Sequence, residues 1–433
     1  MLNYWSFNEC DKETLERLCR RPRMDTGDIT RTVQTIIDQV HRQGDEAVRT
    51  LTRKFDGVDP DPLLWPVRNV DEIPVADDVR KAFEQSFENL LAFHKAQLPQ
   101  SIEVQTMPGV TCRRESRPIE RVGLYIPGGA APLPSTVLML GVPALLAGCS
   151  YKIMATPPDR SGKPPAEVEL AAALADIPEI YLAGGAQAIA AMAYGTDLVR
   201  KVDKVFGPGN QFVTAAKMLL QNSDAIVSMD LPAGPSEVMV VADAASDPGF
   251  IASDLLSQAE HGPDSQVVLV TVGNMDPEPV NTAIREQLAS LPRADTAKRA
   301  LSHSFLMAVD TVDQAVAMIN RYAPEHLIIH LENGREITGS ILNAGSVFLG
   351  PWTPESVGDY ASGTNHTLPT YGYARMYSGI SVDSFIKHIT FQELDRRGLE
   401  AIAPTVIRMA ETEQLHAHKK AVTIRLDHSG KFA

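Results

Sequence analysis

The chain has 433 residues, of which 44% are apolar and 22% are charged, and its formal net charge is −14. This composition is that of an ordinary folded protein, long enough to bury more than one hydrophobic core. The acidic balance argues against nucleic acid or an anionic membrane as a partner, because both require a basic face and no cluster of Lys or Arg provides one.

The cysteines and the N-terminus carry little functional information. Cys10, Cys19, Cys112 and Cys149 are scattered without the CxxC spacing of a metal or redox site. The N-terminus lacks a charged segment followed by an apolar one, and no apolar run approaches the roughly 18 residues that a membrane span needs. We therefore expect the protein in a reducing cytoplasm.

The N-terminal quarter of the chain is predicted to be mainly helical. Val33, Ile36, Ile37 and Val40 follow helical spacing, and a long amphipathic helix is expected from Val75 to Leu98. From Val122 onward, short apolar segments alternate with helical ones, which predicts parallel α/β layers.

The predicted strands form two series. The first consists of VGLYI, KIMAT, EIYLAGG, KVFGPGN and AIVSM, and the second, which begins at Glu237, of EVMVVAD, QVVLVTV, SFLMAV, LIIHL and SVFLG. We expect two α/β lobes that meet at the turn LPAGPS, from Leu231 to Ser236. The segment from Glu400 to Ala421 is rich in helix formers and is expected to be a separate appendage.

Ligands of open α/β sheets bind at the carboxyl ends of the strands, and the loops predicted there carry polar residues. Tyr125 precedes a Pro-Gly-Gly turn, Gln187 begins a helix, and Asn210 is placed to cap a helix whose N-terminal amides would attract an anion. No GxGxxG fingerprint occurs in the chain. Each turn taken alone is more typical of a fold element than of a dinucleotide site.

Gln258 and His261 lie in the segment Asp254 to Gln266, on the predicted last turn of a helix that Gly262-Pro263 ends. Residues three apart share a helix face, so the pair would form half of a metal site. The alternative is that both cap the helix end in solvent, because glutamine is a rare ligand and the spacing is not that of HExxH.

Two further polar clusters span Ala323 to His326 and Pro354 to His366. In an irregular segment after Pro324, Glu325 and His326 would both face one cleft. A histidine takes a proton near neutral pH and a glutamate activates water, so the pair suits acid-base chemistry. On the predicted terminal helix, His418 is equally compatible with a solvated position.

A series of segments then follows in a fixed order over nearly the whole chain: RVGLYIPGG, PLPSTVLML, GGAQAIAA, KVDKVFGPGN, LPAGPSEV, SDLLSQAEHGPDSQ, APEHL, GDYASGTNHTLPT and LHAHKKAV. Their combination resembles the histidinol dehydrogenase family. The resemblance implies an enzyme of histidine biosynthesis that oxidises L-histidinol through L-histidinal to L-histidine, with zinc in the site and NAD as the oxidant of both steps. It also implies an intertwined homodimer.

The fold implied by the resemblance is an α/β fold with two incomplete Rossmann-like lobes, similar to aldehyde dehydrogenases, and small helical N- and C-terminal appendages. This agrees with the missing glycine fingerprint. The expected division is a first lobe with the catalytic and zinc residues (24–125 and 236–380), an NAD-binding lobe (126–235), a small appended domain (1–23 and 381–405) and a C-terminal helical appendage that reaches the partner subunit (406–433).

Residue roles are carried over by motif. The resemblance implies the zinc ligands Gln258, His261, Asp359 and His418. It implies Glu325 and His326 as the acid-base pair and Tyr125, Gln187 and Asn210 as NAD contacts. The implied substrate contacts are Ser236, Gln258, His261, His326, Asp359, Glu413 and His418, of which Glu413 and His418 come from the partner subunit. Cys112 and Cys149 are left with structural roles.

Two other functions are compatible with parts of the pattern. A paralogue of the same fold would oxidise a different small alcohol with the same zinc and Glu-His pair, but Glu413 and His418 favour histidinol. A regulatory protein that only binds a nucleotide would not need the intact Glu325-His326 pair.

Overall fold

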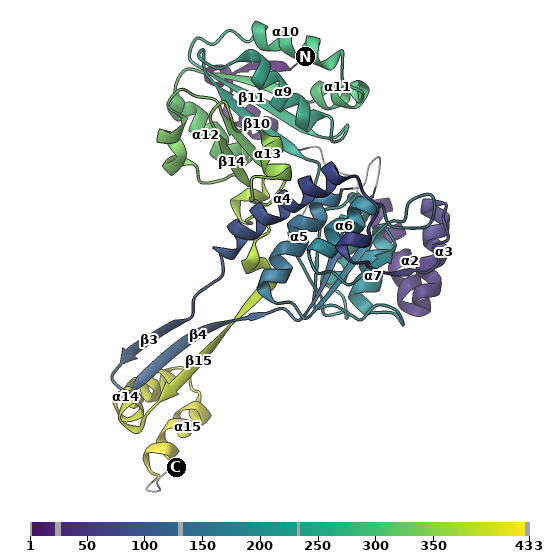
Figure 1. Cartoon of the computed structure of the whole chain (residues 1–433). Helices are drawn as coiled ribbons and strands as arrows, with labels where there is room; N and C mark the ends of the chain where they lie inside the picture. Colours follow the sequence, from purple (N-terminus) through teal and green to yellow (C-terminus); the bar gives the residue numbers. More distant parts are fainter. Residues whose placement is uncertain (1, 22–26, 129–132, 232–233, 429–433) are drawn as a thin grey trace. The chain divides into compact units, whose positions relative to one another are not determined.

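The computed structural model describes residues 2–21, 27–128, 133–231 and 234–428, and the chain divides into two units (Figure 1). The first unit comprises Met1–Gln97 and Ile119–Phe385, and the second comprises Leu98–Pro118 and Ile386–Ala433. In the described part of the chain, no helix is long and apolar enough to cross a membrane.

The first unit contains two sheets, of which the first is parallel throughout. Its strands, in spatial order, are β1 (Asn3–Ser6), β12 (Phe305–Val309), β11 (Gln266–Val272), β10 (Glu237–Ala242), β13 (His326–Ile329) and β14 (Ser346–Leu349). The chain leaves β10 toward β11 and β12, and later returns to place β13 and β14 on the other side. The order of the strands therefore reverses between β10 and β13.

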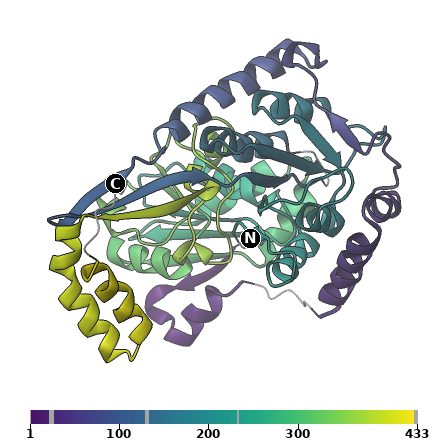
Figure 2. The same cartoon turned by 90° about the horizontal axis from the view of Figure 1, so that it is seen from below.

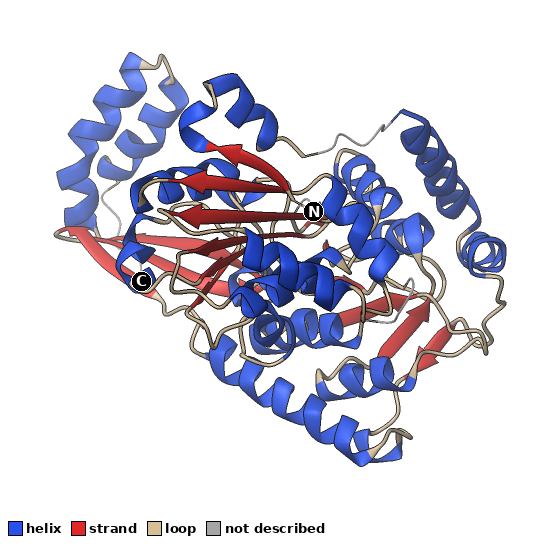
Figure 3. Ribbon diagram, turned by 90° about the horizontal axis from the view of Figure 1, so that it is seen from above, coloured by secondary structure: helices blue, strands red, loops and turns tan. Residues whose placement is uncertain are grey.

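Helices bury both faces of the first sheet, and this explains its continuous apolar strands. Along β10, Val238 and Val240 join the core under one face, while Met239 and Val241 join the core under the other. The helices of the first core are α9 (Pro248–Ala259), α10 (Glu278–Leu288) and α11 (Ala294–Ser302), and those of the second are α1 (Lys12–Leu18) and α12 (Val312–Tyr322). The strands thus lie between layers of helices (Figure 3).

The second sheet is parallel except for its edge strand β2, which runs antiparallel to β7. Its spatial order is β2 (Leu64–Pro66), β7 (Glu179–Leu182), β6 (Tyr151–Thr156), β5 (Arg121–Tyr125), β8 (Lys204–Phe206) and β9 (Ser228–Met229). One face packs on α2 (Gly27–Gln43), α3 (Asp45–Asp56), α7 (Gly185–Tyr194) and α8 (Gln211–Gln221), and the other on α4 (Asp77–Lys95), α5 (Pro134–Ala147) and α6 (Ala166–Leu174). A short helix, α13 (Glu355–Tyr360), follows β14.

The second unit is an antiparallel sheet with two helices. The strands are β15 (Ile386–Leu394), β4 (Val110–Pro118) and β3 (Ile102–Met107), with β4 in the middle. The helices α14 (Arg396–Thr412) and α15 (His416–Leu426) lie side by side (Figure 2). The Asp395 carboxylate caps α14 by accepting from Gly398 N–H at 2.7 Å.

The predicted α/β class, with both series of strands, is confirmed: the first series forms β5 to β9 and the second forms β10 to β14. The structure differs from the predicted division at particular strands. Within 24–125, β2 and β5 pair in the second sheet rather than the first, and β1, within 1–23, pairs with β12. Local spacing identifies a strand but not the distant strand beside it. Residues 232–233 of the predicted inter-lobe turn lie outside the described residues.

Candidate functional site

A cleft of about 490 Å³ in the first unit is lined by residues from both lobes. A cleft of this size takes a small-molecule ligand. Of the residues predicted for the site, those that line it are Asn210, Ser236, Gln258, His261, Glu325, His326 and Asp359.

The cleft lies at the carboxyl ends of strands in the second sheet and at the amino ends of strands in the first sheet. In the second sheet, the loop Gly207–Asn210 follows the carboxyl end of β8, as expected. In the first sheet the site residues stand at the amino ends, because Ser236 precedes β10 and Glu325 precedes β13. The expectation of carboxyl ends is therefore wrong for the first sheet. The amino end of a parallel strand offers free main-chain N–H groups, and one of them is used here to hold a carboxylate.

Glu325 and His326 are both buried and lie close together. The Glu325 carboxylate Oε2 accepts a hydrogen bond from Glu237 N–H at 2.8 Å. His326 Nδ1 lies 3.2 Å from Glu237 O and 3.6 Å from Glu325 Oε2. The chain reaches this position because α12 ends at Tyr322 and Ala323 takes a left-handed conformation with φ of 54°. Glu325 lies in the predicted irregular segment after Pro324, but His326 is already the first residue of β13, so that prediction is confirmed for Glu325 and wrong for His326.

Burial and mutual charge shift the pKa values of the pair. Burial raises the pKa of Glu325 to about 8, although the His326 ring opposes this rise. Burial alone would lower the pKa of His326, but the carboxylates of Glu355, Glu325 and Asp359 outweigh it and raise that pKa to about 10. An imidazole among several carboxylates gives a site that holds and exchanges protons, as acid-base chemistry requires.

A group of ligand-type side chains lies beside the pair. One atom from each of His261, Glu355 and Asp359 falls within 4.8 Å of the others. The Gln258 amide is fully buried, and in the orientation that satisfies both of its ends it donates to Glu355 Oε1 at 2.5 Å and accepts from Glu237 N–H at 3.0 Å. One imidazole and several oxygens form a donor set that suits zinc.

Helix α9 positions Gln258 and His261. Gln258 lies in the last turn of α9, which Asp247 caps at its start by accepting from Gly249 N–H at 2.7 Å. The helix ends at Ala259, so His261 lies just beyond it and not within its last turn as predicted. Both side chains nevertheless line the same cleft. His261 is exposed to the cleft, and partial desolvation by the surrounding protein lowers the pKa of its ring, which favours the neutral form that binds a metal.

The sequence-based site lacks two residues of this cleft region. Glu355 stands four residues before Asp359 on α13, a spacing that puts both on one face and would have identified it. His366 follows in a loop, where its Nδ1 lies 2.8 Å from Asp359 O and its Nε2 lies 3.1 Å from Thr136 Oγ1 of α5. No spacing in the sequence indicated the position of His366.

The residues predicted to contact NAD occupy different environments. Asn210 lines the cleft and caps α8, as predicted, by accepting from Phe212 N–H at 3.0 Å and Val213 N–H at 3.2 Å. Tyr125 and Gln187 are buried and are not among the residues that line the cleft. The Tyr125 hydroxyl accepts from Gly185 N–H at 3.0 Å at the start of α7.

Glu413 and His418 belong to the second unit. Glu413 is the C-cap residue of α14 and His418 lies in the first turn of α15, and both are exposed. The chain turns between the two helices at Gln414, whose φ is 59°. The predicted terminal helix is thus two helices. The predicted roles of both residues in a zinc and substrate site stay predictions.

The comparisons with known proteins agree with one another. The family model described as histidinol dehydrogenase matches residues 19–426. The chain is 53% identical to the chloroplastic histidinol dehydrogenase of Arabidopsis thaliana, over 98% of this chain and 91% of the relative, and 51% identical to the histidinol dehydrogenase of Vibrio parahaemolyticus, over 96% of each. It is similar to the crystal structure of histidinol dehydrogenase from Elizabethkingia anophelis, with a TM-score of 0.94, 46% identity and 98% of each chain covered.

A more distant likeness concerns the fold alone. The structure of lactaldehyde dehydrogenase matches with a TM-score of 0.50 and 11% identity, over 88% of this chain and 91% of that chain. The predicted likeness to aldehyde dehydrogenases is confirmed at the level of architecture. It gives no information about the residues of the site.

Proposed function

The chain belongs to the histidinol dehydrogenase family, and we propose that it oxidises L-histidinol through L-histidinal to L-histidine in histidine biosynthesis. NAD accepts a hydride in each of the two steps. The observation that carries the proposal is a single cleft in which a buried Glu325-His326 pair lies beside the ligand-type residues His261 and Asp359.

Zinc is the proposed metal, held by Gln258, His261 and Asp359 together with His418. The fit rests on the donor set and on Glu355 Oε2, which within the described structure is buried with no hydrogen-bond partner beside this group. A carboxylate oxygen without a partner is costly unless a cation or a proton compensates it. When bound, zinc would anchor the substrate and polarise it without taking up electrons.

The protein residues move the protons. In the first step the neutral form of His326, which its raised pKa makes abundant only at alkaline pH, takes the hydroxyl proton of histidinol while the hydride on the same carbon leaves for NAD, which gives the aldehyde. In the second step the ionised form of Glu325, which its raised pKa favours above about pH 8, takes a proton from water, the water oxygen attacks the aldehyde carbon, and the hydrate anion formed loses its hydride to a second NAD. The hydrogen bond from Glu237 N–H to Glu325 at 2.8 Å keeps one carboxylate oxygen in place during this transfer.

Further contacts hold the two ligands. Ser236 lies at the entrance to β10 and lines the cleft, where it would contact the substrate. Asn210 stands at the N-terminus of α8, whose free amides favour a phosphate group of NAD. Tyr125 and Gln187 complete the proposed NAD contacts.

The active form proposed is a homodimer in which Glu413 and His418 come from the partner subunit. Glu413 would bind the amine of the substrate, because a carboxylate attracts a cation, and His418 would complete the zinc ligands. Support comes from the exposure of both side chains on the helices of the second unit.

The activity is tested by mixing the purified chain with histidinol and NAD and following NADH. We expect about two NADH for each histidinol consumed, and a hydride balance of this kind requires both oxidations. Release of histidinal after a single NADH would contradict the proposed second step. A chain that contains zinc but forms no NADH would refute the activity itself.

The shared site is tested with two inactive variants, His261→Asn and His418→Asn. If sites are shared, a mixed dimer has one site with both changes and one intact site. Random mixing makes about half of the dimers mixed, so activity should return to about a quarter of normal. If tagged mixed dimers are isolated and remain inactive, His418 does not act across the subunits.

A further inference from the structure

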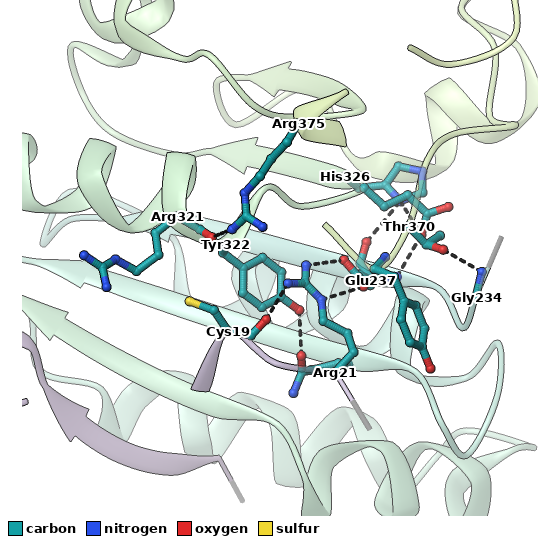
Figure 4. A network of polar contacts seen from close by, with 12 residues as sticks. Cys19, Arg21, Gly234, Glu237, Arg321, Tyr322, His326, Thr370 and Arg375 are labelled. Atoms are coloured by element: carbon teal, nitrogen blue, oxygen red, sulfur yellow. Dashed lines mark hydrogen bonds and ion pairs between the residues drawn. The ribbon is translucent and has the colours of Figure 1, made fainter. Parts of the chain in front are cut away.

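Behind the Glu325-His326 pair lies a buried ion pair between Arg21 and Glu237 (Figure 4). Arg21 Nε donates to Glu237 Oε1 at 2.8 Å and Nη2 donates to Oε2 at 2.7 Å, so the contact is bidentate. The Arg21 and Glu237 side chains are 4% and 1% exposed. Removing two charges from water costs free energy, so a buried ion pair is stable only with close geometry and further hydrogen bonds.

Those further bonds are present on both sides. Arg21 Nη1 donates to Cys19 O at 2.7 Å, and its guanidinium carbon lies 3.7 Å from the centre of the Tyr322 ring. Glu237 Oε1 also accepts from Tyr371 N–H at 2.8 Å. The pair therefore connects the segment after α1, the end of α12 and the start of β10.

The main chain of Glu237 touches both members of the acid-base pair. Its N–H donates to Glu325 Oε2 at 2.8 Å, and its carbonyl oxygen lies 3.2 Å from His326 Nδ1. The side chain of Glu237 is clamped by Arg21, and the main chain of the same residue fixes the orientation of the two catalytic groups. A shift of this residue would move both at once.

We propose that Arg21 and Glu237 are positioning residues, which set the geometry of Glu325 and His326 through the main chain of Glu237. Arg21 thereby makes the N-terminal segment part of the active-site support, although it lies behind the catalytic groups. The inference rests on the proposed function, because it needs Glu325 and His326 to be the acid-base pair. Misplacement by about 1 Å is enough to slow an enzyme on the order of 100-fold.

The chain offers a matched control in the second sheet's lobe. Arg68 binds Glu169 in the same bidentate manner, with Nε at 2.9 Å from Oε1 and Nη2 at 2.6 Å from Oε2. Glu169 is likewise 1% exposed and accepts a main-chain N–H, that of Arg68. It has no contact with Glu325 or His326 among the described hydrogen bonds. Arg68, unlike Arg21, is 40% exposed, so Glu169→Gln removes a carboxylate with the same bonding pattern without leaving a buried cation and without touching the proposed support.

The experiment compares Glu237→Gln, Arg21→Lys and Glu169→Gln for thermal stability and steady-state kinetics. We expect Glu237→Gln to lower kcat about 10- to 100-fold while the KM for NAD changes less than about threefold, since the proposed NAD contacts do not involve Glu237; the KM for histidinol is not used as a control, because Glu237 N–H also contacts Gln258. Arg21→Lys should retain part of kcat, because it keeps the charge but loses the bidentate contact. Glu169→Gln should lose stability with kcat unchanged.

A neutral double variant, Arg21→Gln with Glu237→Gln, covers the case in which a single change fails to fold. It leaves no lone buried charge, so it should be more stable than Glu237→Gln, which leaves Arg21 without its carboxylate, with kcat still low. If kcat recovers together with stability, or if Glu237→Gln behaves like Glu169→Gln, the inference is overturned. Normal turnover by the wild-type chain in the same assay keeps that outcome separate from a failure of the proposed function.

Discussion

Lys217 of α8 holds the loop that leads to Asn210, and Lys217→Met should weaken NAD binding. Its Nζ lies 2.6 Å from Asp230 Oδ1 and also donates to Gly207 O, while Asp230 Oδ2 accepts from Gly207 N–H at 2.7 Å. Both polar groups of Gly207 are therefore fixed by one ion pair. Only glycine fits at this position of the loop, because Gly207 has a φ of 122° and a Cβ added to it would stand 2.0 Å from Tyr125 O.

The size of the effect follows from burial. The Lys217 and Asp230 side chains are 8% and 1% exposed, so the variant leaves a buried carboxylate without its cation. Breaking a buried pair in this way costs about 3–5 kcal/mol. With an unfolding entropy of about 2.1 cal/mol/K per residue, the chain of 433 residues has about 0.9 kcal/mol/K, which converts the loss into a melting temperature lower by about 3–6 °C.

The assay measures thermal unfolding and the KM for each substrate. We expect the KM for NAD to rise about tenfold, equivalent to about 1.4 kcal/mol, and the KM for histidinol to change less than about twofold. Lys152→Met is the control for the loss of a buried lysine: Lys152 of β6 is 9% exposed and binds Asp176 at 3.0 Å, but the Asp176 side chain is 78% exposed, so no buried carboxylate is left without its cation. Lys152→Met should lower the thermal stability and leave the KM for NAD unchanged. If Lys217→Met also loses stability without a change in the KM for NAD, the reasoning about the loop is refuted.

Three further changes have defined outcomes. Glu325→Gln should slow the oxidation of supplied histidinal more than the first hydride transfer, and equal losses in single-turnover NADH bursts would contradict the proposed division of labour. Dialysis against a chelator should abolish turnover and added zinc should restore it; full activity in a metal-free preparation would argue against the metal. Burial lowers the pKa of His94 in the folded chain. The neutral ring therefore contributes fully to stability above the pKa of the unfolded chain, about 6.5, and this contribution falls as the pH drops toward the lower pKa of the folded chain. His94→Leu should therefore lose less thermal stability than the wild type between about pH 7.5 and 5.5, and parallel losses in both proteins would rule out this role.

The strands of both lobes could be predicted because their cause is local. An apolar segment such as Glu237–Ala242 is buried on both faces, and that burial leaves a continuous run of Val and Met in the sequence. The cap at Asn210 could be predicted for the same reason, since an N-cap depends on residues two and three positions ahead. The strand β2 was not predicted, and the division that grouped residues 24–125 with the first lobe does not match the sheet in which β2 and β5 pair, because pairing joins residues far apart in the chain.

The candidate site could be predicted in part. Glu325 and His326 are neighbours in sequence, and the turn at Ala323 that follows α12 brings both to the cleft. Asp359 lies in the polar cluster that the sequence shows from Pro354 to His366, but its role as a zinc ligand was reached only through the family resemblance, although its spacing from Glu355 on a short helix was visible. His366 lies in a loop whose path depends on contacts with Thr136 of α5 and with the main chain of Asp359, so no periodicity predicts it.

Arg21 and Glu237 mark the limit of sequence reasoning more clearly than any other residues. A charged residue at the start of an apolar strand is ordinarily interpreted as the point where the strand meets solvent, and that interpretation fits Glu237 until its partner is known. The partner is 216 positions earlier in the chain, beyond the reach of any helix or strand period. Because burial of Glu237 is tolerable only with Arg21 docked against it, the environment of the residue that holds Glu325 and His326 is decided by tertiary packing of the N-terminal segment. A substitution at Arg21 would thus appear in sequence as a change in a connecting segment, while its physical effect would fall on the acid-base pair.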